Sequence, residues 1–202
     1  LRRFFADGGG DSLFLVDEAH NLVDRSRDMF SASLRKDEVL AVRRAVRERF
    51  PEIAKALAKV NRWFLDERKA LEGRAGNARC TGEFPSALIG ILRTAVPAIE
   101  TVLARDETGP WRDSLTDWYF EANRFVRTAD WFGEEYTLCT AADSRDVTAT
   151  LYCLDPSELM REAFGRARAS VLISATLQPF DYFGSVLGIG DARQVMLGSP
   201  FP

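Results

Sequence analysis

The sequence predicts an α/β protein that carries a long α-rich insertion. Two short apolar runs, one near each end of the chain, are typical of strands in a buried parallel sheet. Between them, apolar residues recur mostly at helical spacing. A connection of this length must contain its own structure.

The first apolar run covers residues 12–16 (Ser-Leu-Phe-Leu-Val) and predicts a buried strand. It leads directly into Asp17, Glu18, Ala19 and His20. Polar residues at the carboxyl end of a parallel strand lie where open α/β sheets bind ligands. We therefore expect a candidate site at this end of the strand.

Four amphipathic helices are predicted in the middle of the chain. Pro51 separates the first two, residues 73–83 hold loop signals, Pro97 predicts a kink in the third, and Gly109 with Pro110 starts the fourth. Their apolar stripes are Val39, Val42, Val46 and Phe50; Ile53, Leu57, Val60 and Phe64; Leu88, Ile91, Leu92, Ala95, Ile99, Val102 and Leu103; and Trp111, Leu115, Trp118, Ala122, Phe125 and Ala129. Such helices, each burying one face, predict a small helical domain.

The last part of the chain returns to α/β character. Residues 136–140 and 147–154 predict a β-hairpin, and residues 155–158 (Asp-Pro-Ser-Glu) predict a capped helix start. Residues 170–174 (Ser-Val-Leu-Ile-Ser) predict a second buried strand, and a short helix is expected near residues 181–187.

Composition and cysteine usage restrict the class of protein. The net charge is −3 and the pI about 5.4, so the chain as a whole lacks a basic nucleic-acid footprint. Its longest apolar runs are a few residues, which predicts no membrane span. Cys80, Cys139 and Cys153 form no Cys-x-x-Cys pair, so reduced structural thiols are expected rather than a zinc site or a disulfide framework. Because the sequence begins at Leu1 in the middle of a pattern, we expect an internal part of a longer protein.

Two adjacent carboxylates at a strand end suit nucleotide hydrolysis. One of them, Asp17, would hold Mg²⁺ through water, since Mg²⁺ prefers oxygen ligands and keeps much of its hydration. The other, Glu18, would polarise the water that attacks a γ-phosphate. The simpler alternative is an ordinary acidic turn after a strand.

The two ends of the chain resemble superfamily 2 helicases. Residues 13–22 (Leu-Phe-Leu-Val-Asp-Glu-Ala-His-Asn-Leu) resemble their motif II, the DEAH box, and the final Asn-Leu is typical of the DinG/XPD branch. Residues 171–177 (Val-Leu-Ile-Ser-Ala-Thr-Leu) resemble motif III, and residues 199–201 (Ser-Pro-Phe) are similar to the stretch that enters the second motor domain. By this resemblance, Ser174 and Thr176 would hydrogen-bond toward the carboxylates and His20, which would couple the nucleotide site to the DNA path.

The spacing of the motifs points to the same branch. Positions 21 to 173, or 153 residues, lie between His20 and Ser174, and the DinG/XPD branch has its Arch domain at this point. The resemblance implies an α/β remnant of a RecA-like motor domain, with parallel strands, and a large α-rich Arch insertion containing a β-hairpin. We expect motor-domain segments at residues 1–30 and 148–202, the latter with motif III and the start of the second motor domain, and the Arch at residues 31–147.

The resemblance also implies what the full-length protein does. It would be an ATP- and Mg²⁺-dependent DNA helicase, moving 5′ to 3′ on single-stranded or forked DNA in repair or replication. It would be a monomer in the bacterial cytoplasm, associated with the nucleoid and not with a membrane. The chain has no Gly-x-x-x-x-Gly-Lys-[Ser/Thr] phosphate loop, so it is expected to be inactive alone. The family's iron–sulfur cysteines, where present, precede motif II, so any cluster would lie upstream and none within this chain.

Two other functions remain open: a helical adaptor with a fortuitous DEAH that contacts a protein partner, and a nucleic-acid-stimulated ATPase that remodels complexes without unwinding. DNA-binding residues are not assigned. The aromatics that could stack on bases sit mostly at stripe positions, which favours core packing; they are Trp63, Phe64, Trp111, Trp118, Tyr119, Trp131 and Phe132. The basic patch Arg43, Arg44, Arg47 and Arg49 is interleaved with acidic residues, which favours a solvated face over a DNA-guiding surface.

One structural expectation separates the helicase from the adaptor. The strands ending at Val16 and near Ser174 should lie in one parallel sheet with their carboxyl ends together. Asp17, Glu18 and His20 would then approach motif III. Placement of the two strands in separate domains would favour the adaptor.

Overall fold

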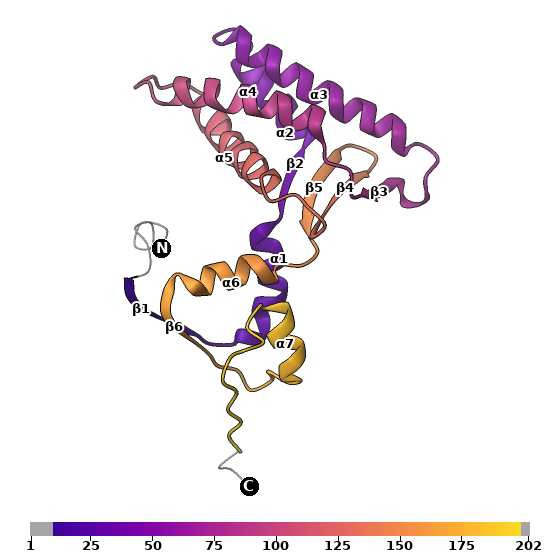
Figure 1. Cartoon of the computed structure of the whole chain (residues 1–202). Coiled ribbons are helices and arrows are strands. Elements are labelled where there is room, and N and C mark those ends of the chain that lie inside the picture. The colour runs from indigo at the N-terminus through magenta and orange to yellow at the C-terminus, as the bar shows by residue number, and fades with distance from the viewer. Residues whose placement is uncertain (1–9, 199–202) are drawn as a thin grey trace. The chain divides into compact units, whose positions relative to one another are not determined.

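The structure is a computed structural model that describes residues 10–198 (Figure 1). These residues form a mixed α/β protein with seven α-helices, a two-stranded parallel sheet and a four-stranded antiparallel sheet. They divide into two compact units. The sheet unit comprises residues 10–29 and 155–198, and the helical unit comprises residues 30–154. Residues 199–201, which resemble the start of a second motor domain, lie outside the described residues.

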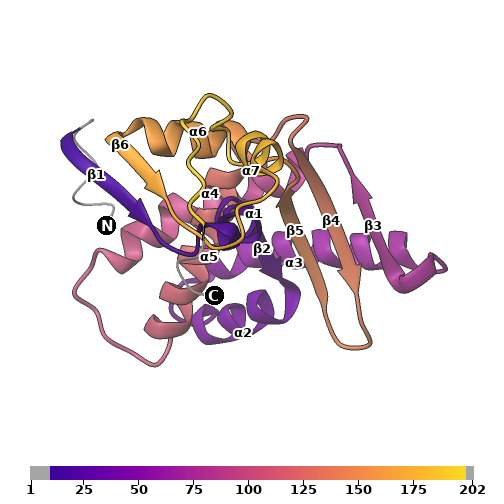
Figure 2. The ribbon, with the colours of Figure 1, turned by 90° about the horizontal axis from the view of Figure 1, so that it is seen from below.

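The sheet unit is built on two parallel strands, β1 (Gly10–Val16) and β6 (Ala167–Leu172). Leu15 pairs with Val171, and Val16 pairs with Leu172. Figure 2 shows the two strands side by side and pointing the same way. The prediction that the two apolar runs join one parallel sheet is confirmed.

Three α-helices and a 3-10 turn complete the sheet unit. The 3-10 turn is η2 (Ala19–Asn21), and the helices are α1 (Leu22–Phe30), whose last residue begins the helical unit, α6 (Ser157–Gly165) and α7 (Phe180–Val186). A helix begins at Ser157, within the predicted start, but its N-cap residue is Pro156 and no side chain caps it. Asp155 accepts a hydrogen bond from the Ser157 amide at 2.9 Å, and Glu158 pairs with Arg161, so the predicted capping box is wrong. Gly188 follows α7 with φ +65°, and a Cβ there would collide with the Ser157 carbonyl oxygen. Only glycine therefore fits this contact between the end of α7 and α6.

The prediction that the two parallel strands are buried is wrong: among the described residues, β1 and β6 have no fully buried side chain, and one face of the sheet is open to solvent. Leu13 and Leu15 are 70% and 72% exposed, and Val171 and Ile173 are 52% and 48% exposed. The cause is that α6 packs against β6, whereas no described element of the sheet unit covers the opposite face. Parallel sheets are normally covered on both faces. Full burial of such a side chain is worth about 1.5–3 kcal/mol, and each of these forgoes part of it.

The helical unit contains the four predicted amphipathic helices. They are α2 (Lys36–Val46), α3 (Pro51–Leu71), α4 (Ser86–Leu103) and α5 (Arg112–Ala129). The predicted stripes form its core, and residues such as Val39, Leu57, Leu92 and Phe125 are fully buried. Pro97 lies inside α4, which continues through it to Leu103. The prediction of four amphipathic helices is confirmed.

An antiparallel sheet packs against these helices, with strand order β2, β5, β4, β3. The predicted hairpin is confirmed as β4 (Tyr136–Ala142) and β5 (Val147–Cys153). The outer strands β2 (Ala32–Arg35) and β3 (Ala78–Thr81), the latter preceded by the 3-10 turn η3 (Ala75–Asn77), were not predicted. With four residues each, they are too short for alternation to identify them.

The boundary between the units lies after Leu154, seven residues beyond the expected end of the insertion at residue 147. The reason is the position of β5, which pairs with β2 on one side and with β4 on the other. This strand is therefore part of the helical unit and not of the sheet unit.

The expectation of three reduced thiols is wrong for two of the cysteines. Cys80 and Cys139 form a disulfide. They are directly opposite each other on β3 and β4, with their Cα atoms 4.1 Å apart. The linear spacing of 59 residues carries no sign of this pairing, because it depends on the unpredicted strand β3. Cys153 is buried and lies outside the disulfide.

Asp146 organises the turn between β4 and β5 and is only 4% exposed. Its carboxylate accepts hydrogen bonds from the amides of Asp37 at 3.0 Å and Val147 at 2.7 Å, and from Arg35 Nε at 3.0 Å. Arg68 donates to its carbonyl oxygen at 2.8 Å. Burial opposes ionisation, but hydrogen bonds with the Asp37 carboxyl, the Val147 amide and Arg35 outweigh it and lower the pKa of Asp146.

We expect Asp146→Ala to lower the free energy of unfolding by about 3 kcal/mol at neutral pH, because two amide donors and Arg35 lose their acceptor. The lowered pKa sets the pH dependence: below the unfolded-state pKa of 3.8, the unfolded chain binds a proton that the folded carboxylate resists. The contribution of Asp146 is therefore present above that pH and lost as the pH falls through the folded-state pKa. Urea unfolding of both proteins at several pH values measures it, and a difference that grows on acidification would contradict this assignment.

Helix α4 is long and apolar enough to cross a membrane by length and composition alone. This is weak evidence, because a core helix of a soluble protein passes the same test. Leu88, Leu92 and Ile99 of α4 are fully buried in the helical unit. The side chains that make α4 apolar therefore belong in part to the protein core.

Candidate functional site

The carboxylates of Asp17 and Glu18 lie directly beyond the end of β1. Glu18 has φ 49° and ψ 42°, in the left-handed region that residues other than glycine seldom adopt. Its amide donates a hydrogen bond to Asp17 Oδ1 at 2.8 Å. Such a conformation costs on the order of 1 kcal/mol and persists only where neighbouring structure holds it.

Backbone hydrogen bonds from the end of β6 hold this turn in place. The Ala19 amide donates to the Ile173 carbonyl at 3.0 Å, and the Ile173 amide donates to the Val16 carbonyl at 2.8 Å. Ala19 is fully buried. The parallel pairing therefore continues past both strands and fixes the segment that carries Asp17, Glu18 and His20.

His20 connects the two motifs. Its Nδ1 atom lies 2.8 Å from Ser174 Oγ and 3.2 Å from Glu18 Oε2. A protonated Nδ1 donates to the carboxylate, whereas an unprotonated Nδ1 accepts a hydrogen bond from the serine hydroxyl. A protonated Nδ1 can also donate to the serine oxygen, because a hydroxyl both donates and accepts. The two contacts share Nδ1 and so join Glu18, His20 and Ser174 in one group of interacting side chains.

Thr176 takes a smaller part than the resemblance implied. Its hydroxyl lies 3.4 Å from Ser174 Oγ, and its amide donates to the same oxygen at 3.2 Å. Within residues 10–198, no hydrogen bond joins Thr176 to His20, Asp17 or Glu18. Thr176 thus contacts Ser174, and Ser174 in turn contacts His20.

The candidate site is open to solvent. The side chains of Glu18 and His20 are 64% and 37% exposed. Among the described residues, no cluster of three His, Cys, Asp or Glu side chains could hold a metal ion. Mg²⁺ needs no such cluster when phosphate and water oxygens complete its coordination shell. The exposed carboxylate of Asp17 therefore fits the expected role of holding Mg²⁺ through water.

Sequence reasoning missed the part played by main-chain groups. The carbonyls of Val16 and Ile173 belong to apolar residues, and nothing in their side chains marks them as parts of a site. The left-handed conformation of Glu18 could not be predicted from the sequence either, because this region favours Gly, Asn and Asp over Glu.

A comparison with protein-family models and with curated protein sequences finds no match to this chain.

Proposed function

We propose that this chain is part of an ATP- and Mg²⁺-dependent DNA helicase of the DinG/XPD type. The observation that carries the proposal is the hydrogen bond of 2.8 Å between His20 and Ser174 at the ends of two parallel strands. Two short polar motifs separated by 153 residues would not be expected to meet in this way by chance. The two motifs meet at the carboxyl ends of parallel strands, and this is the edge at which an open α/β sheet binds its ligand.

In the proposed reaction, Asp17 and Glu18 have different roles at the γ-phosphate of ATP. Glu18, held by its left-handed backbone at the strand end, would orient and polarise the attacking water. Asp17 would hold Mg²⁺ through water. When bound, the ion neutralises charge on the phosphate oxygens.

His20 and Ser174 would couple the binding and hydrolysis of ATP at Glu18 to the part of the protein that contacts DNA. Glu18 and Ser174 both contact Nδ1 of His20, so a movement of Glu18 during the nucleotide cycle would change how His20 holds Ser174. Because Ser174 follows β6 and precedes the segment to α7, we propose that this segment moves with the nucleotide cycle.

The helical unit, residues 30–154, would be the Arch of this helicase, and the sheet unit would be part of its first motor domain. The exposed apolar face formed by Leu13, Leu15 and Val171 is consistent with a parallel sheet that further elements cover in the proposed motor domain. We propose single-stranded or forked DNA as the partner and 5′ to 3′ movement in the bacterial cytoplasm. The adaptor hypothesis gains less support, because it gives no reason for the two motifs to meet.

We expect the full-length protein that contains this chain to release phosphate from ATP in the presence of single-stranded DNA and to displace a strand from a forked duplex. The chain of 202 residues alone should not hydrolyse ATP, because it lacks a phosphate loop and positioning supplies most of the catalysis. Phosphate release and strand displacement measure the two activities. Hydrolysis without displacement would favour the remodeller, and no DNA-stimulated hydrolysis at all would contradict the proposal.

A further inference from the structure

Helix α4 is largely exposed and yet carries almost no charge. Of its 18 residues, only Arg93 and Glu100 are charged, and only 39% are buried in the helical unit. A helix at a protein surface normally turns charged and polar residues toward water. The exposed part of α4 therefore has the composition of a face that another element covers.

Both charges of α4 lie toward α5. Arg93 donates a hydrogen bond to Asp130, at the end of α5, at 2.7 Å. Burial raises the pKa of Tyr119 in the middle of α5, and the nearby charge of Glu100 raises it further. The side of α4 that is turned away from α5 is therefore free of charge.

Small side chains follow one another along this uncharged side of α4. Ala87, Gly90, Thr94 and Ala98, here called the α4 stripe, are exposed and spaced three or four residues apart, so they share one face of the helix. The Thr94 hydroxyl donates to the Gly90 carbonyl at 3.1 Å and so needs no partner from outside. A Cβ added at Gly90 would meet open space. A second helix can therefore approach the α4 stripe closely, because small side chains shorten the distance between helix axes.

A hollow of about 530 Å³ lies beside the α4 stripe, between α3 and α4. Its apolar walls are formed by Ala58, Trp63, Ala87 and Ile91. Trp63 packs edge-on against the fully buried Phe64, which holds its ring in place. The hollow can therefore accept a bulky apolar side chain from a partner.

Cations border this hollow on the α3 side. They are Lys55, Lys59 and Arg62. Among the described residues, no ion pair involves Lys55 or Lys59, and Arg62 has only an exposed contact of 3.9 Å with Asp66, the one carboxylate of the hollow. The surface thus combines an apolar centre with one positive edge.

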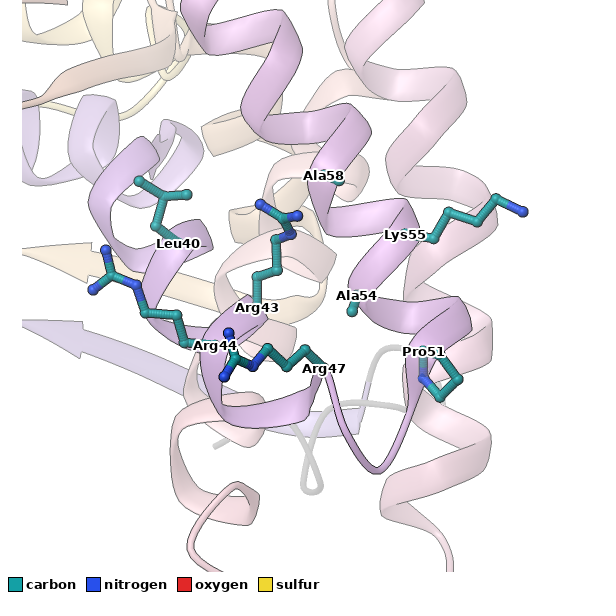
Figure 3. A pocket seen from close by; sticks show the side chains of 8 residues that line it. All are labelled: Leu40, Arg43, Arg44, Arg47, Pro51, Ala54, Lys55 and Ala58. Carbon is teal, nitrogen blue, oxygen red and sulfur yellow. The ribbon is translucent and has the colours of Figure 1, made fainter.

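A different hollow, of about 600 Å³, lies on the other side of α3, against α2 (Figure 3). It is bordered by Arg43, Arg44 and Arg47, and none of its lining residues is aromatic. In Figure 3, Lys55 extends away from α2. The arginines of α2 therefore supply cations of the same helical unit that do not border the α4 stripe.

We propose that the α4 stripe and the hollow beside it form a docking site for an amphipathic helix of a partner protein. The apolar seam of this helix packs on the stripe, one of its bulky apolar side chains enters the hollow, and its acidic edge faces Lys55, Lys59 and Arg62. A helix that docks in a groove presents its apolar anchors at this spacing of three, four and seven residues. The proposal concerns the helical unit alone and does not depend on the nucleotide chemistry proposed for the sheet unit.

The side chains of this surface favour a protein helix over a membrane or a nucleic acid. Faces that bind membranes carry large apolar side chains such as Trp, Phe and Leu, which enter the lipid, whereas the α4 stripe consists of small residues. Single-stranded nucleic acid is bound along a track of cations, whereas the α4 side of this surface is uncharged. A helix with an apolar seam and an acidic edge matches both halves of the surface.

The test uses the whole chain and a fluorescein-labelled synthetic helix of three heptads, with Leu and Ala along its seam and Glu along both edges of the seam, so that either direction of docking brings Glu to the cations. A second peptide has Lys in place of Glu. In an anisotropy titration, the Glu peptide should bind at least about ten-fold more tightly, because like charges repel across an interface. Lys59→Gln, Arg62→Gln should remove most of this preference, whereas the control Arg43→Gln, Arg44→Gln should keep it.

A second pair of variants tests the close approach of the helix. Thr94→Gln, Ala98→Gln should weaken binding of the Glu peptide at least about ten-fold, because the longer side chains collide with the docked helix. The matched control Ala41→Gln, Ala45→Gln places the same side chains, also four residues apart, at exposed positions of α2. This control should bind like the original chain, and circular dichroism should show that all variants are folded.

Absence of binding by the Glu peptide, equal affinity for the two peptides, or equal loss in the stripe variant and its control would overturn the proposal. Tighter binding to phosphatidylglycerol vesicles or to an oligothymidylate, lost in Thr94→Gln, Ala98→Gln, would also overturn it, since the surface would then serve lipid or nucleic acid. Self-association of the chain in analytical ultracentrifugation that the same variant abolishes would assign the surface to a second copy instead.

Discussion

Glu18→Gln should reduce ATP hydrolysis by the full-length protein by about 10³-fold while leaving ATP binding intact. Glutamine keeps the size and the hydrogen-bonding capacity of the side chain but cannot polarise or deprotonate the attacking water. Loss of a positioned general base typically costs 10² to 10⁴-fold in rate. Single-turnover phosphate release measures the rate, and binding of a fluorescent ATP analogue measures the affinity.

Two further variants make this test specific. Asp17→Asn should impair the Mg²⁺-dependent steps, so that raising the concentration of Mg²⁺ partly restores activity. Asp24→Asn removes a carboxylate of α1 that is 94% exposed and lies only 3.9 Å from Arg27, and it should leave hydrolysis unchanged. Normal hydrolysis in Glu18→Gln would show that the role given to Glu18 is wrong.

Loss of the Cys80–Cys139 disulfide should lower the free energy of unfolding of the helical unit by about 4 kcal/mol. The disulfide closes a loop of 59 residues, and the loss of loop-closure entropy in the unfolded chain gives this magnitude. Urea unfolding of the chain with and without dithiothreitol measures the difference. The double variant Cys80→Ser, Cys139→Ser should unfold like the reduced chain and should not respond to dithiothreitol.

If the reduced chain and the oxidised chain unfold at the same urea concentration, the disulfide is not a stabilising element. The disulfide disagrees with the proposed cytoplasmic location, because disulfides are rare in reducing compartments. If the two cysteines are reduced there, the stability of the helical unit rests on its core and on the Asp146 cluster.

The sequence allowed the larger elements of the fold to be predicted, because their apolar residues follow one spacing over many residues. All four stripes of the helical unit became buried faces of α2 to α5. The edge strands β2 and β3 were not predicted. Ala-Ser-Leu-Arg alternates apolar and polar residues as a strand does, but alternation over only four residues is the shortest that indicates a strand and also occurs in loops. Without β3, the pairing of Cys80 with Cys139 could not be foreseen either.

For the candidate site, the residues could be predicted and their exact contacts could not. The order of the motifs and the parallel-strand rule together placed His20 near Ser174, as the structure has them. The shared contact of Glu18 and Ser174 with His20 Nδ1 depends on distances of 3.2 and 2.8 Å, which no sequence pattern contains. The exposure of Leu13 and Leu15 also depends on which elements cover the sheet, and not on the apolar run itself.

The helical unit begins and ends on neighbouring strands. β2 carries the chain into it and β5 carries the chain out, and Ala32 pairs directly with Leu151, so the two crossings are about 5 Å apart. A gap of this size can be closed by a tight turn. Close ends are what make an inserted domain tolerable, so the paired strands β2 and β5 give the helical unit the end geometry of a domain inserted within another.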